Sequence, residues 1–107
     1  MFGIFGKSEN EADICRDISE KIAETEEAFR VARSIYDTFG LPDGDYYTAY
    51  QSFSNFVDMW VMNDFGKRNS KLQLSLIRKS LNVIHKQRMF ITSNLTKQYG
   101  NPDDSNS

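Results

Sequence analysis

The chain of 107 residues is 39% hydrophobic and 26% charged, with a net charge of −2, a composition typical of one folded domain and not of a disordered chain. Its single cysteine, Cys15, excludes an intramolecular disulfide, and no apolar run of about eighteen residues is present that could span a membrane. The apolar N-terminal segment 1–7 is too short and too interrupted by glycine for a secretion signal, so we expect a cytoplasmic protein.

The first predicted helix covers about residues 9–39. Its apolar side chains recur at steps of three and four and therefore fall on one stripe. They are Ile14, Ile18, Ile22, Phe29, Ala32, Tyr36 and Phe39. Acidic residues crowd the first turn, where the helix dipole favours negative charge, and Gly40 followed by Pro42 ends the helix.

The second predicted helix covers about residues 46–65 and stops at Gly66. Most of its apolar side chains lie on one stripe, made of Tyr46, Tyr50, Phe53, Phe56, Val57, Trp60 and Val61. Four more lie off this stripe, namely Tyr47, Met59, Met62 and Phe65. This segment is therefore apolar on more than one side, whereas a helix on the surface of a bundle needs a single apolar face.

The third predicted helix covers about residues 70–99 and carries two apolar ridges. The first has a heptad-like spacing and contains Leu74, Ile77, Leu81, Ile84, Ile91, Leu95 and Tyr99. The second lies roughly 140–200° away on a helical wheel and contains Leu72, Leu76, Val83 and Phe90. Because short loops make consecutive helices antiparallel, we predict an all-α, antiparallel up-down-up three-helix bundle. It forms a single domain over residues 8–100, and residues 101–107 are a disordered polar tail.

The second and third helices carry more apolar surface than a three-helix core consumes. Exposed apolar patches on small proteins often mark association, and aromatic and Met residues are enriched at the centres of interfaces. We therefore expect a protein–protein interaction module, either a homodimer or an adaptor, inhibitor or immunity-type binder. The expected contacts are Tyr47, Met59, Met62, Phe65, Leu76, Val83 and Phe90. The competing interpretation is that residues 2–5 fold back over this surface, or that the core is simply broad.

Charge is divided unevenly along the chain. Nine acidic and four basic residues lie between Glu9 and Asp37, whereas Lys67 to Pro102 contains eight basic residues and no acidic one. One interpretation is that the first and third helices lie side by side and pair their charges. The alternative function is nucleic-acid binding by the basic arc of the third helix. Its expected phosphate contacts are Lys67, Arg68, Lys71, Arg78, Lys79 and Lys86.

Residues that could carry chemistry are few. With one histidine, His85, and one cysteine, the chain has no zinc-ligand set, and no glycine loop precedes a helix to hold a phosphate. We therefore expect no metal, no cofactor and no enzymatic activity, and a structural His85 at the border of the core. Residues 2–6 would bind a membrane only weakly, so we expect them to pack on the domain.

Arg88 falls at the centre of the main apolar stripe of the third helix, where a charge is costly unless it is paired. We expect its guanidinium to meet a carboxylate such as Asp64 or Glu24, or to reach water. The functional alternative is a contact with an acidic group on a partner.

Overall fold

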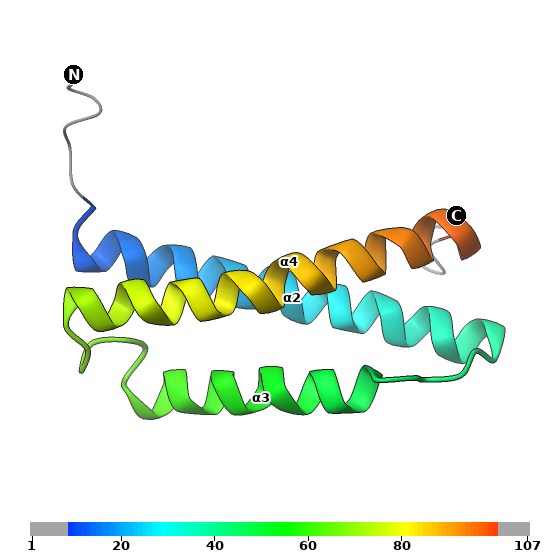
Figure 1. Ribbon diagram of the computed structural model, residues 1–107, viewed down its shortest axis with the longest axis horizontal. Coiled ribbons are helices and arrows are strands. Elements are labelled where there is room, and N and C mark those ends of the chain that lie inside the picture. The colour runs from blue at the N-terminus through cyan, green and yellow to red at the C-terminus, as the bar shows by residue number, and fades with distance from the viewer. Residues whose placement is uncertain (1–8, 101–107) are drawn as a thin grey trace, which may run out of the picture.

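The computed structural model describes residues 9–100, which form three helices: α2, Glu11–Phe39; α3, Tyr46–Met62; and α4, Lys71–Tyr99. α2 and α4 begin at the same end of the molecule, and α3 runs in the opposite direction (Figure 1). No strand occurs within residues 9–100. The predicted all-α, up-down-up three-helix bundle is confirmed. The predictions made for residues 1–7 and 101–107 fall outside the described residues.

Side-chain caps set the starts of α2 and α4. The Asp13 backbone N–H donates to Asn10 Oδ1 at 2.8 Å, and the Asn10 N–H donates to the Asp13 carboxylate at 3.3 Å. Ser70 and Gln73 make the same reciprocal pair of bonds before α4. These bonds satisfy backbone donors that the first turn of a helix leaves unpaired. α2 therefore begins at Glu11, two residues after the predicted start.

α3 ends at Met62, three residues before its predicted end at Phe65. Asp64 and Phe65 both have a φ of 56°, in the left-handed region, and Gly66 has a φ of 90°. Three successive residues with positive φ cannot continue a right-handed helix, so the chain turns away from α3 there. At Gly66 a side chain is excluded for a second reason, because an added Cβ would lie 2.5 Å from Trp60 Cη2.

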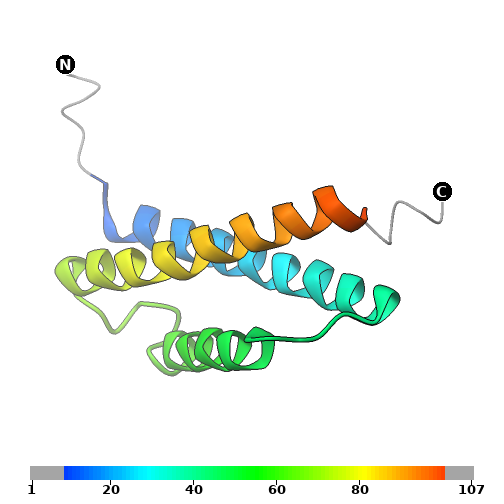
Figure 2. The same ribbon diagram turned by 45° about the vertical axis from the view of Figure 1, so that its right-hand side comes forward.

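The two long helices pack closely, and α3 attaches to them through large rings. α2 and α4 contact each other along their length and cross in the view of Figure 2. At the α2–α3 interface the Phe29 ring stacks on Phe53, with ring centroids 5.4 Å apart, and meets Tyr46 edge-on at 5.6 Å. The Tyr46 hydroxyl donates to the Phe29 carbonyl at 3.2 Å. Aromatic pairs in these geometries contribute beyond the area that they bury.

Arg88 is buried, with 5% of its surface exposed, but it does not meet a carboxylate. Its guanidinium carbon lies 4.1 Å from the centre of the Phe29 ring and 5.9 Å from that of Tyr46. Among the described residues, Nε and Nη1 of Arg88 have no hydrogen-bond partner. The expected pair with Asp64 or Glu24 is therefore wrong, because aromatic faces occupy the space around this charge.

Candidate docking surface

The apolar side chains predicted to be in excess are exposed. Met62, Val83 and Phe90 expose 76%, 68% and 67% of their surface, and no described part of the chain covers them. The other predicted contacts are also exposed, at 46–56%: Tyr47, Met59, Phe65 and Leu76. The core of residues 9–100 is therefore complete without these side chains. Their role as contacts stays a prediction.

Four of the exposed side chains form a single line along α4, which we call the outer ridge: Leu72, Leu76, Val83 and Phe90. At about 100° per residue these positions fall within about 40° of one another. The buried residues Leu74, Leu81 and Arg88 lie on the opposite side of the helix. From first to last, the ridge extends about 27 Å at about 1.5 Å per residue. α4 therefore has one face in the core and one apolar face toward solvent.

Not all the predicted contacts join the outer ridge. The Tyr47 ring, at the start of α3, faces the guanidinium of Arg33 at 5.1 Å and lines a hollow between α2 and α3. Phe65 lines a separate hollow of about 370 Å³, together with Cys15 and Gly66. Met59 and Met62 are exposed in the last turn of α3. Tyr47 and Phe65 therefore line hollows in which no residue of the outer ridge takes part.

Lysines stand in the same line as the outer ridge. Starting at Leu72, exposed residues follow at alternating steps of four and three: Leu76, Lys79, Val83, Lys86 and Phe90. Lys79 and Lys86 thus lie on the face predicted for a protein partner, although their charge had predicted a separate phosphate-binding arc. Their spacing in the sequence could have revealed this overlap.

The predicted charge pairing between the first and third helices is confirmed at Arg78. Arg78 donates to both carboxylate oxygens of Glu9, at 2.8 and 2.9 Å, and lies 3.5 Å from Asp17. These bonds lower the pKa of Glu9, and bonding chiefly to Lys21 lowers that of Asp17. One of the six proposed phosphate contacts, Arg78, is thus engaged within the protein.

His85 also contacts the first helix, and its Nε2 lies 2.8 Å from a carboxylate oxygen of Glu24. The His85 side chain is 16% exposed, so the prediction of a structural histidine at the border of the core is confirmed. The other five basic residues of the predicted arc make no ion pair with any residue in 9–100: Lys67, Arg68, Lys71, Lys79 and Lys86. Two of these five, Lys79 and Lys86, stand in the line of the outer ridge, so part of the positive charge of the arc lies there.

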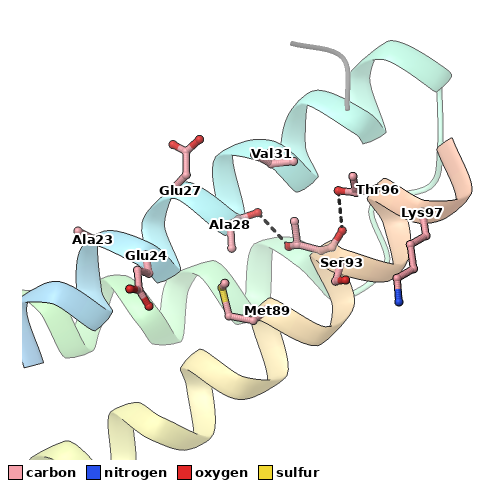
Figure 3. Close-up of a pocket in the computed structure, with 10 residues that line it drawn as sticks. Ala23, Glu24, Glu27, Ala28, Val31, Met89, Ser93, Thr96 and Lys97 are labelled. Atoms are coloured by element: carbon pink, nitrogen blue, oxygen red, sulfur yellow. Dashed lines mark hydrogen bonds between the residues drawn. The ribbon is translucent and has the colours of Figure 1, made fainter. Parts of the chain in front are cut away.

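A shallow groove of about 610 Å³ runs between α2 and α4, with side chains of both helices along it (Figure 3). Its apolar lining includes Val31 and Met89. The Thr92 hydroxyl donates to the Ala28 carbonyl at 2.9 Å, and the Thr96 hydroxyl donates to the Thr92 carbonyl at 2.9 Å. The Thr92 bond joins α4 to α2, whereas the Thr96 bond lies within α4, and both hydroxyls therefore already donate to the backbone.

Neither a metal site nor a membrane span is found in the part of the chain that the structure describes. No group of three or more His, Cys, Asp or Glu side chains there could hold a metal ion. Likewise, no helix there is long and apolar enough to cross a bilayer.

Comparisons with protein-family models, with curated proteins and with solved structures found no match for the chain.

Proposed function

We propose that the protein is a non-enzymatic interaction module that binds another protein through the outer ridge of α4. The observation that carries this proposal is a line of four large apolar side chains on α4, each more than half exposed. Exposed apolar patches on small proteins often mark association, and buried aromatic and aliphatic anchors supply much of the energy of interfaces.

The size of the ridge limits the affinity that it can supply. Full burial of an aliphatic or aromatic side chain contributes about 1.5–3 kcal/mol, and the four ridge residues are already partly buried, so covering their exposed surface supplies roughly 4–8 kcal/mol. Association itself costs at least about 4 kcal/mol, and a micromolar complex requires about 8 kcal/mol net. A stable complex therefore needs further contacts beside the ridge. The polar and charged side chains next to the ridge can make them.

Affinity capture with aspartate variants tests the proposal. The tagged protein is used to capture partners from its native cell, and Val83→Asp/Phe90→Asp is compared with wild type by quantitative mass spectrometry. The matched control, Thr48→Asp/Asn55→Asp, adds the same charges at the same spacing on exposed positions of α3. We expect a protein that wild type and control retain and the ridge variant loses, with unchanged circular dichroism. Equal recovery by the ridge variant would refute the proposal.

Nucleic-acid binding is the alternative function, supported by the basic residues that make no ion pair within residues 9–100. Fluorescence titration with random-sequence duplex and single strands at low salt tests it, because phosphate contacts make binding salt-sensitive. Lys71→Glu/Lys79→Glu/Lys86→Glu should abolish such binding and the ridge variant should spare it. Absence of salt-sensitive binding by wild type would remove this alternative.

Self-association is the other form that the interaction proposal can take. Sedimentation over a range of protein concentrations measures it directly. A strict monomer would refute a homodimer and leave binding to a different protein as the function.

A further inference from the structure

The outer ridge has the spacing of a helix-to-helix seam. Together with Lys79 and Lys86, which lie in the same line, its residues alternate at steps of four and three, the repeat that keeps two α-helices in contact over several turns. A helix that lies on a membrane usually carries a wider apolar face with lysines on its polar side, whereas Lys79 and Lys86 stand between the apolar residues of the ridge. The pattern therefore fits a narrow partner, such as one helix, better than a flat surface.

The charge of Lys79 and Lys86, which stand within this seam, specifies the partner further. α4 contains no acidic residue, and neither Lys79 nor Lys86 forms an ion pair with any part of the chain from residue 9 to residue 100. A helix that packs on the outer ridge therefore meets two lysines that no ion pair within residues 9–100 neutralises. Carboxylates on that helix would balance the positive charge of the two lysines and direct the approach of the helix.

A second copy of this chain does not supply such a helix. Its α4 would bring lysines against lysines, because both surfaces lack acidic residues. Its α2 is acidic, but within Glu11–Phe39 the single large exposed hydrophobic residue is Phe39, at the C-terminal end. Its α3 has exposed apolar side chains but a single acidic residue, Asp58. None of the three described helices of a second copy thus offers both an apolar seam and a row of carboxylates.

We infer that the outer ridge of α4 receives an amphipathic helix of another protein whose seam is flanked by acidic side chains. Apolar residues of that helix pack between Leu76, Val83 and Phe90, and its carboxylates lie beside Lys79 and Lys86. This inference rests on the proposed function, since it names the chemistry of the partner for the same surface.

Two synthetic peptides test the acidic chemistry. Both are 28-residue helix formers with the same apolar seam, and one has glutamate beside the seam where the other has lysine. Each is labelled and used at nanomolar concentration, and binding to the full chain is followed by fluorescence anisotropy in 100 mM salt. We expect the glutamate peptide to bind at least tenfold more tightly than the lysine peptide, and this preference to fall as salt is raised.

Charge reversal on the ridge supplies the decisive comparison. In Lys79→Glu/Lys86→Glu the preference should invert, so that the lysine peptide binds more tightly. Lys67→Glu/Arg68→Glu makes the same change in net charge within the exposed α3–α4 connection and should leave the preference for glutamate in place. Val83→Asp/Phe90→Asp should weaken both peptides at least tenfold.

The outcomes separate the two proposals. Equal binding of both peptides, unchanged by Lys79→Glu/Lys86→Glu, would overturn the acidic partner and leave the ridge as a docking surface. Peptide binding that Val83→Asp/Phe90→Asp leaves at the wild-type level would overturn the use of the ridge itself, and with it the proposed function. Binding of phosphatidylglycerol vesicles in place of either peptide, or ridge-dependent dimerisation of the protein alone, would also overturn the inference.

Discussion

Replacing the buried charge of Arg88 by methionine should stabilise the protein. The Arg88 guanidinium is 5% exposed, and two of its nitrogen atoms have no partner in the described part of the chain. Burial lowers the pKa of Arg88, but an arginine remains protonated near neutral pH, so the charge itself is buried. The aromatic ring of Phe29, 4.1 Å away, offsets part of the cost.

The magnitude follows from two opposing terms. The effective penalty for burying a charge is several kcal/mol, and a desolvated cation–π contact returns about 2 kcal/mol. Arg88→Met keeps an unbranched side chain against Phe29 and removes the penalty. We therefore expect the free energy of unfolding to rise by about 1–3 kcal/mol, and the melting temperature to rise by about 4–8 °C for each kcal/mol in a domain of this size.

Urea and thermal unfolding at pH 7, followed by circular dichroism, measure the effect. A double-mutant cycle with Phe29→Leu isolates the cation–π contact, for which we expect a coupling of about 1–2 kcal/mol. If Arg88→Met lowered the free energy of unfolding by 1 kcal/mol or more, the charge would be stabilising where it lies, and our conclusion that its burial is only partly compensated would be wrong.

Three further predictions concern other parts of the bundle. Gly66→Ala should lower the free energy of unfolding by about 2–4 kcal/mol, because its methyl group meets the indole beneath it and its φ is positive. Gly44→Ala, with a φ of 55° and open space around it, should cost only about 1–2 kcal/mol in the same urea titration, and equal losses would contradict the packing argument. The lowered pKa of Asp17, caused chiefly by its bond to Lys21, means that this ion pair stabilises the fold above the ordinary carboxyl range and loses that effect as the pH falls through the folded-state pKa. Lys21→Gln should therefore flatten the decline in melting temperature between pH 5 and pH 3, and an identical decline would contradict this. Because burial raises the pKa of the Cys15 thiol, it should react with Ellman's reagent at pH 7.5 more slowly than in urea, and equal rates would contradict its burial.

Helix number and order could be predicted from the sequence because hydrophobic periodicity persists over many turns. The ends were harder to predict. α2 begins two residues later than predicted because Asn10 caps it, and the sequence alone does not show which of several polar residues near this point is the cap. The left-handed conformations of Asp64 and Phe65 shortened α3, and residues other than glycine seldom adopt them, so only Gly66 signalled the turn.

The site could be predicted in part. The spacing of Leu76, Val83 and Phe90 alone placed them on the side of α4 away from the core, and they are exposed there. Tyr47 was grouped with them because a helical wheel of one helix does not show which neighbour each side faces. The surroundings of Arg88 were mispredicted for a related reason: the rings around it come from residues far apart in the sequence.

A photo-cross-linking scan tests the central claim most directly. Benzoylphenylalanine replaces Leu76, Val83 or Phe90, one at a time, in the protein expressed in its native cell, with Thr48 and Asn55 of α3 as control positions. The account predicts the same cross-linked protein from all three ridge positions and none from the controls. Equal yields at ridge and control positions, or no cross-link from the ridge, would contradict it.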